Sequence, residues 1–248
     1  MSSPYQLGFI SDEAIFEHVK ATVLKYRFNI DLNKFNANLL DPIKLTFDAK
    51  VYKKTIKDVI NDEALRQIDK SNTNHIGYFH QNIFNILGNG WYCPKKGYDV
   101  ANDNLHVYVE MKNKHNTMNS SSSQKTYMRM QNTLLADAQA SCFLVEVIAQ
   151  ASQNRVWKVT VDDQQMSNER IRRVSIDQFY GIVTGDALAF KKLCQALPTI
   201  IEDVVQSLKK NKTSNTVIQE LKAIDENLLK SVYLLSFAHY EGFDDFTV

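Results

Sequence analysis

An alternating segment near the middle of the chain places the strongest constraint on its fold. In YDVANDNLHVYVEMKNK, residues 98–114, apolar and polar residues alternate in the second half, a pattern typical of a β-strand with one buried face. The segment predicts two strands joined by a polar turn around Ala101–Asn104. Apolar or alternating runs at 142–150, 155–163 and 172–186 predict three more strands, so we expect the middle of the chain to form a sheet.

Helical patterns surround these predicted strands. Ser11 followed by two acidic residues is typical of a helix start, and apolar residues recur at helical spacing after it. Further helices are predicted over residues 55–70, 75–87, 125–139, 187–210 and 216–236. IKLTFDAKVY, residues 43–52, predicts a short strand. This order predicts an α/β protein with a central mixed β-sheet flanked by helices, in a single domain over residues 1–248.

The composition argues against membrane insertion and export. No apolar run approaches the roughly 18 residues that a membrane span needs, and MSSPYQLGFISDE lacks the basic and apolar regions of a signal peptide. Cys93, Cys142 and Cys194 lie far apart and form no CxxC pair, which suits free thiols in a reducing cytoplasm. The net charge of +1 does not exclude a nucleic acid partner, because acidic residues elsewhere offset the basic clusters.

Glu110 and Lys112 share one face of the predicted strand, because side chains two residues apart on a strand point the same way. Asp99 lies on the preceding strand of the hairpin, and antiparallel pairing brings opposed Cβ atoms to about 4.5–5.5 Å. Two carboxylates this close favour a cation between them. Because Mg²⁺ accepts one or two carboxylates together with water and substrate phosphate oxygens, Asp99 and Glu110 are predicted metal ligands.

Lys112 completes the set of groups that phosphodiester hydrolysis needs. A metal held by carboxylates activates a water and screens the phosphate, and a lysine orients that water or stabilises the developing charge. We therefore predict Asp99, Glu110 and Lys112 as the catalytic residues. The alternative from spacing alone is an ordinary cross-strand ion pair, since an acidic residue two positions before a lysine is a common pattern.

A rival pair with the same spacing occurs earlier in the chain. Asp48 and Lys50 lie in the strand-like segment at 43–52, and Asp41 precedes them. Glu110 and Lys112 are favoured because they follow a glycine-rich loop and a partner strand that carries an aspartate. They also lie on an apolar strand that leads directly into an Asn/Ser segment.

The pattern Asp99…Glu110-Met-Lys112 resembles the signature of the PD-(D/E)XK nuclease superfamily, with Tyr98 at the position of the proline in that name. IGYFHQNIF, GYDV and YVEMKNKHNTMNSSSSQKTY resemble segments of the type II restriction endonucleases that cut double-stranded DNA at GGNCC. The resemblance implies a PD-(D/E)XK restriction-endonuclease-like fold and a bacterial, Mg²⁺-dependent homodimer that leaves 5′-phosphate ends. It also implies that Asp99 and Glu110 bind the metal and that Lys112 is the catalytic lysine.

The Asn/Ser segment after the strand offers small polar groups and basic residues to a DNA backbone. Such side chains, backbone N–H groups and helix N-termini are common phosphate partners. Ser122 or Ser123 is the predicted cap of the next helix. The alternative is a disordered polar linker followed by a solvated basic helix. The predicted DNA-binding residues are Asn113, Lys114, His115, Asn116, Asn119, Ser120, Ser122, Lys125 and Arg129.

These inferences predict a type II restriction endonuclease of a bacterial restriction-modification system, located in the cytoplasm. The catalytic core is expected at about residues 76–165, with helical N-terminal and C-terminal parts packed on it. Arg170, Arg172 and Arg173 are candidates for reading guanine in the major groove. Two alternatives stay open: a structure-specific repair or recombination nuclease of the same superfamily, and a non-catalytic DNA-binding protein that retains the fold.

Overall fold

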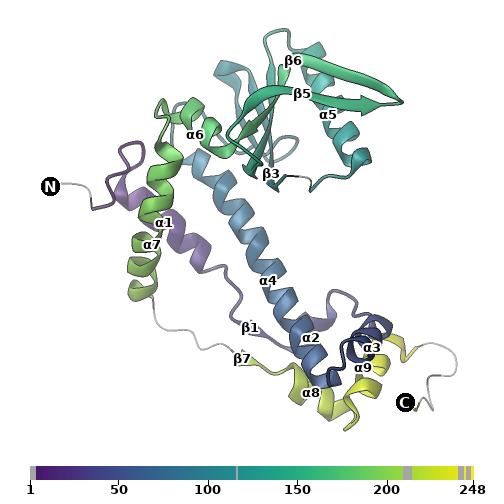
Figure 1. Ribbon diagram of the computed structural model, residues 1–248. Coiled ribbons are helices and arrows are strands. Elements are labelled where there is room, and N and C mark those ends of the chain that lie inside the picture. Colours follow the sequence, from purple (N-terminus) through teal and green to yellow (C-terminus); the bar gives the residue numbers. More distant parts are fainter. Residues whose placement is uncertain (1–3, 116, 209–213, 240–242, 244–246) are drawn as a thin grey trace. The chain divides into compact units, whose positions relative to one another are not determined.

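The computed structural model describes residues 4–115, 117–208, 214–239, 243 and 247–248. The chain forms two compact units (Figure 1). Unit 1 consists of residues 1–24 and 76–208, and unit 2 consists of residues 25–75 and 209–248. The predicted catalytic residues all belong to unit 1. The organisation of the whole chain as a single domain stays a prediction.

Unit 1 is a mixture of helices and strands, whereas unit 2 is mainly helical. The elements of unit 1 are α1 (Asp12–Val23), the last turns of α4 (Ile56–Asn82), η1 (Ile83–Asn85), β2 (Val100–Asn102), η2 (Asp103–Leu105), β3 (Val107–Lys114), α5 (Ser120–Ala136), β4 (Ser141–Ile148), β5 (Asn154–Val161), β6 (Gln164–Ser175), α6 (Ile176–Thr184) and α7 (Ala189–Ser207). The elements of unit 2 are β1 (Asn29–Ile30), α2 (Leu32–Asn36), α3 (Pro42–Val51), the first turns of α4, β7 (Ser214–Asn215), α8 (Val217–Ile224) and α9 (Leu228–Phe237).

The strands of unit 1 form one mixed sheet, in which β2, β3, β4, β6 and β5 lie side by side in that order. β2 with β3 and β5 with β6 are antiparallel pairs, whereas β3–β4 and β4–β6 are parallel. Lys112 of β3 lies beside Glu146 of β4, which lies beside Ser175 of β6. The predicted mixed sheet with flanking helices is confirmed, and the predicted hairpin is present as β2 and β3, with its turn at η2.

Helices cover both faces of the sheet, so the side chains on the two faces of β3 meet different helices. Val109 and Met111 are buried in a core that includes residues of α1, α6 and α7. On the other face, α5 packs on β4 and β5 through side chains that include the buried Tyr127. Because side chains alternate along a strand, Glu110 and Lys112 lie on the face that α5 covers.

The predicted strand at residues 43–52 is wrong, because this segment is helix α3 of unit 2. The Asp41 carboxylate caps the helix by accepting hydrogen bonds from the backbone N–H groups of Ile43 and Lys44 at 3.0 and 3.1 Å. Pro42 occupies the first turn, where its missing N–H costs no helical hydrogen bond. Local capping therefore outweighed the partly alternating apolar pattern.

The strand predicted at 172–186 is right only in its first residues. β6 starts earlier, at Gln164, and ends at Ser175, and residues 176–184 form α6. Buried residues of α6 that include Phe179 and Val183 recur at helical spacing, so the apolar run meets the core as a helix. The apolar content of this run had suggested a strand, but its period is that of a helix.

The predicted helices are present with different boundaries. The two helices predicted at 55–70 and 75–87 are one continuous helix, α4, and the helix predicted at 216–236 is divided into α8 and α9. α5 begins at Ser120, inside the Asn/Ser segment. Across the described ranges, no helix is both long enough and apolar enough to cross a membrane.

Candidate active site

The hairpin of β2 and β3 brings the three predicted catalytic residues together. The backbone N–H of Asp99 donates to the carbonyl of Val109 at 2.9 Å, which extends the hairpin ladder by one residue before β2. The Asp99 carboxylate accepts a hydrogen bond of 2.7 Å from the backbone N–H of Met111, the residue between Glu110 and Lys112. Asp99 is thereby tied to the middle of the Glu-x-Lys pattern.

The Glu110 carboxylate lies between two cations. Its Oε1 accepts a hydrogen bond from Nζ of Lys112 at 2.7 Å, and its Oε2 accepts one from Nη2 of Arg129 in α5. The Glu110 side chain is 13% exposed, so both contacts form at the border of the protein interior. Together they engage both oxygens of Glu110 and fix its orientation.

Arg129, a predicted DNA contact, lies within this cluster. Its Nη1 donates to the carbonyl of Gly97 at 2.7 Å, and its guanidinium lies 4.8 Å from the centroid of the Tyr98 ring. The Tyr98 hydroxyl is 2.7 Å from Oγ1 of Thr133, one turn further along α5. These contacts tie the loop before Asp99 to α5. Helical spacing identifies the residues that share a face of α5, but it does not show which strand that face meets.

The charges around Asp99 act on its ionisation in opposite directions. Burial raises the pKa of the Asp99 carboxyl above its ordinary value, and the negative charge of Glu110 raises it further. The hydrogen bond from Met111 and the positive charges of Lys112 and Arg129 lower the pKa, because they favour the carboxylate. The two carboxylates of the cluster and the cations of Lys112 and Arg129 together carry no net formal charge.

The donor set of the cluster suits a hard divalent cation. Asp99 and Glu110 offer carboxylate oxygens, which Mg²⁺ prefers. Within the residues that the structure describes, no group of three or more His, Cys, Asp or Glu side chains is placed to hold a metal ion. Two protein carboxylates are sufficient for Mg²⁺, since it usually keeps several waters and takes phosphate oxygens of the substrate as ligands.

A second charged cluster adjoins Lys112, and the sequence pattern did not indicate it. Glu146 of β4 is 1% exposed and lies in register with Lys112. Its carboxylate accepts hydrogen bonds from Nη2 of Arg173 and, at 2.9 Å, from Nε of Arg173. Nδ1 of His115 lies 3.1 Å from both Glu146 oxygens. The sequence signal for this cluster was Glu146 itself, an acidic residue inside the apolar run FLVEVI. The residues that surround Glu146 depend on strand register, which the run does not show.

Two of the predicted DNA-binding residues point into the protein. The amide of Asn113 lies so close to Gly77 of α4 that a Cβ at Gly77 would be 3.1 Å from it, on the opposite face of β3 from Lys112. His115 is half-buried against β4. Asn116 lies outside the described residues. The predicted DNA-binding residues that are exposed are Lys114, Asn119, Ser120, Ser122 and Lys125.

Asn119 begins the helix that follows the Asn/Ser segment. Its Oδ1 accepts a hydrogen bond from the backbone N–H of Ser122 at 2.8 Å, so Asn119 is the N-cap of α5. The predicted cap at Ser122 or Ser123 is wrong, because both serines already lie in the first turn of the helix. The serine run is therefore helical.

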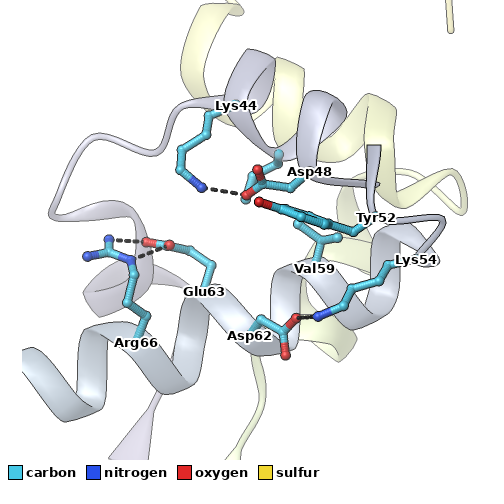
Figure 2. Close-up of a pocket in the computed structure, with 9 residues that line it drawn as sticks. Lys44, Asp48, Tyr52, Lys54, Val59, Asp62, Glu63 and Arg66 are labelled. Atoms are coloured by element: carbon cyan, nitrogen blue, oxygen red, sulfur yellow. Dashed lines mark hydrogen bonds and ion pairs between the residues drawn. The ribbon is translucent and has the colours of Figure 1, made fainter. Parts of the chain in front are cut away.

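The rival pair Asp48 and Lys50 lies on α3 of unit 2, where residues two apart do not share a face. Asp48 lines a pocket of about 180 Å³ with two further acidic residues, Asp62 and Glu63. Figure 2 shows a cation beside each of the three carboxylates, which are therefore already neutralised. The pairs are Lys44–Asp48, Lys54–Asp62 and Arg66–Glu63.

A comparison with known protein families identifies the family of this chain. The profile of the Eco47II restriction endonuclease family matches residues 7–206, which include the whole sheet of unit 1 and the Asp99, Glu110 and Lys112 cluster. This chain belongs to the Eco47II restriction endonuclease family. The resemblance to type II restriction endonucleases is therefore confirmed.

Two curated relatives are similar to this member of the Eco47II restriction endonuclease family over most of their length. The chain is 31% identical to the type II restriction enzyme Sau96I of Staphylococcus aureus, over 96% of this chain and 97% of that enzyme. It is 27% identical to the type II restriction enzyme Eco47II of Escherichia coli, over 80% of this chain and 88% of that enzyme. No solved structure matches the chain significantly.

Proposed function

We propose that this restriction endonuclease cleaves both strands of double-stranded DNA at GGNCC, in a reaction that needs Mg²⁺ and leaves 5′-phosphate ends. The observation that carries the proposal is the cluster of Asp99, Glu110 and Lys112 at the β2–β3 hairpin. Membership of the Eco47II restriction endonuclease family supports sequence-specific cleavage of DNA. The resemblance of the central segments to enzymes that cut GGNCC supports that sequence as the site.

We assign Asp99 and Glu110 as the metal ligands and Lys112 as the catalytic lysine. A bound Mg²⁺ supplies a water of lowered pKa and positive charge at the scissile phosphate. The Lys112 amine, 2.7 Å from Glu110, is the donor that orients the attacking water or stabilises negative charge on the phosphate. Arg129 holds Glu110 from its other side and offsets the second negative charge.

The same residues favour the PD-(D/E)XK fold for unit 1. That fold assigns the aspartate to one strand of a hairpin and the Glu-x-Lys pattern to the other, on a mixed sheet with helices on both faces. Asp99 directly precedes β2, Glu110 and Lys112 lie on β3, and the sheet continues through parallel β4 and β6. These features support the assignment.

A homodimer follows from the chemistry of the substrate. The chain carries one Asp99, Glu110 and Lys112 cluster, while a palindromic duplex presents two scissile phosphates related by a two-fold axis. Two subunits related by the same axis would each cut one strand.

Incubation with phage DNA tests the proposal. With Mg²⁺ we expect discrete fragments whose sequenced ends carry 5′-phosphates and define one palindromic site, and we expect a chelator to stop the reaction. A smear, or cleavage limited to flaps and junctions, would instead favour a structure-specific repair or recombination nuclease. Salt-dependent DNA binding with no Mg²⁺-dependent turnover would indicate a non-catalytic DNA-binding protein.

A further inference from the structure

A small polar cavity lies next to Lys112, on the face of the sheet that α5 covers. Its volume is about 70 Å³, which is room for more than one water molecule. Three cationic side chains line it, those of Lys112, Lys114 and Arg173, together with the carboxylate of Glu146. Lys114 is exposed, so the cavity reaches the surface. The other lining residues are Thr117, Met118, Ser123 and Trp157.

Glu146 fixes the position of Arg173 at this cavity. Nε and Nη2 of Arg173 donate to Oε1 of Glu146, and the other oxygen, Oε2, is 3.3 Å from Nε2 of Gln153 and 3.1 Å from Nδ1 of His115. Both oxygens of Glu146 are therefore engaged by the protein, which makes Glu146 a good support for a guanidinium.

The lining has an excess of positive charge. Glu146 offsets the charge of Arg173, and Lys112 pairs with Glu110, which is not part of the lining. Lys114 makes no ion pair with any residue that the structure describes. A polar cavity lined by Lys114, which has no ion pair among the described residues, and by Arg173, which Glu146 holds in place, suits an anion.

The chemistry of the lining favours a phosphate. Arginine, lysine and hydroxyl side chains are the usual partners of nucleic acid phosphates, and Ser123 adds a hydroxyl from the first turn of α5. Lys112 and Lys114 are two residues apart on β3, or about 7 Å along the strand. Neighbouring phosphates of one DNA strand have a similar spacing. When Lys112 acts on the scissile phosphate, the next phosphate can therefore reach Lys114.

We propose that this cavity binds a backbone phosphate next to the scissile phosphate, on the strand that is cut. Lys114 and Arg173 contact its non-bridging oxygens, and Glu146 is a positioning residue that orients Arg173. The pocket holds the cleaved strand in register with the Asp99 and Glu110 carboxylates. This inference rests on the proposed function, because it needs a DNA strand in the catalytic site.

The test is single-turnover cleavage of duplexes that carry one neutral methylphosphonate, moved one position at a time along the strand. For the wild-type enzyme we expect a loss of rate of about tenfold or more at one non-scissile position beside the cut, as for the loss of a charge-assisted contact. Lys114→Ala should cut the unmodified duplex more slowly and should lose most of its sensitivity at that position. Arg173→Lys and Glu146→Gln should each lose part of the sensitivity to the methylphosphonate at that position.

The control is Lys158→Ala, which removes an exposed lysine of β5 that does not line the cavity and should keep the full wild-type sensitivity. Lys114 is exposed, so its substitution does not threaten folding. If Lys114→Ala cleaves DNA and keeps the wild-type sensitivity at every position, or if the wild-type enzyme has no sensitive non-scissile position, the phosphate pocket is refuted while the proposed function stands. A wild-type enzyme that cuts no duplex would refute the proposed function itself.

Discussion

At the scale of single residues, Glu110 is where the charges of the site converge. Lys112 and Arg129 each hold one oxygen of its carboxylate, and Asp99 is held nearby by the backbone of Met111. The two cations balance the formal charges of the two carboxylates. The same balance makes the site sensitive to the loss of any one of these charges.

Replacing the proposed catalytic lysine should abolish most cleavage and leave DNA binding in place. For Lys112→Ala we expect a fall in the single-turnover rate of roughly 10²–10³-fold, typical of the loss of one donor to a developing negative charge. The matched control is Lys50→Ala, which removes the lysine of the rival pair on α3 and should cleave normally. Wild-type cleavage by Lys112→Ala would contradict the assignment.

Removing the positive charge of Arg129 should change the pH dependence of cleavage. Arg129 lowers the pKa of Asp99, so its loss should raise that pKa further. If Asp99 is a metal ligand, as proposed, it must be ionised to bind the metal, and activity should fall as the pH drops through the pKa of Asp99. We therefore expect Arg129→Gln to move the acidic limb of the rate–pH profile to higher pH. A limb that stays in place or moves to lower pH would disagree with this role.

At the scale of elements, β3 and α5 build the site jointly. β3 directs Val109 and Met111 into one core and Glu110 and Lys112 toward α5, so a shift of register by one residue would exchange the two sets. α5 begins beside the end of β3, packs on the sheet through the buried Tyr127, and directs Arg129 back to Glu110. The site therefore depends on where α5 starts.

The N-cap of α5 should contribute measurably to stability. Asn119→Ala removes the acceptor of the Ser122 N–H and should lower the free energy of unfolding by about 1 kcal/mol. Asn119→Asp keeps an acceptor at the same position and should retain most of that stability. Urea denaturation of the three proteins provides the comparison. An alanine variant as stable as the wild type would show that the cap does not matter for folding.

At the scale of the whole molecule, the candidate active site lies in one of two compact units. Unit 1 contains the sheet, the Asp99, Glu110 and Lys112 cluster and the polar cavity, while unit 2 contains the rival pair Asp48 and Lys50 and the ion-paired pocket. Near the end of α4 in unit 1, the ring of His80 contacts the rings of Phe79 and Phe190. Its Nδ1 is buried and has no hydrogen-bond partner among the described residues.

The burial of His80 should make the folded protein sensitive to acid. Burial lowers the pKa of His80 from 6.5 to about 4, so the unfolded chain binds a proton between these values and the folded chain does not. The contribution of neutral His80 to the free energy of unfolding should be fully present above about pH 6.5. It should be lost as the pH falls to about 4, by about 3 kcal/mol in total for this shift. In urea denaturation at pH 7 and pH 5, His80→Phe should lose less stability at pH 5 than the wild type. An equal loss in both proteins would assign the acid sensitivity to other groups.

The proposed dimer should couple the two active sites on one DNA molecule. We expect a mass in sedimentation of twice the 28.5 kDa of the chain. When wild-type subunits are mixed with an excess of Lys112→Ala subunits, we expect mixed dimers with one working site. These mixed dimers should nick a plasmid instead of linearising it. Linear product without a nicked intermediate from such mixed dimers would contradict one cut per subunit.

The sequence by itself determined the local features. Alternation along residues 105–114 identified β3, and the separation of Glu110 and Lys112 placed them on one face of that strand, because the side-chain period of a strand is two. The hairpin that carries Asp99 and the mixed α/β class also followed from local patterns. The catalytic roles of these residues stay predictions.

Only the tertiary structure decided which side chains meet across elements. Glu146 lies beside Lys112 because of the parallel register of β3 and β4, and Arg129 reaches Glu110 because of the way α5 packs on the sheet. Register and helix docking depend on the burial of the whole apolar surface, which no local pattern encodes. The cap at Asp41 competes with the apolar pattern after it, and the local signals alone do not show which of the two prevails.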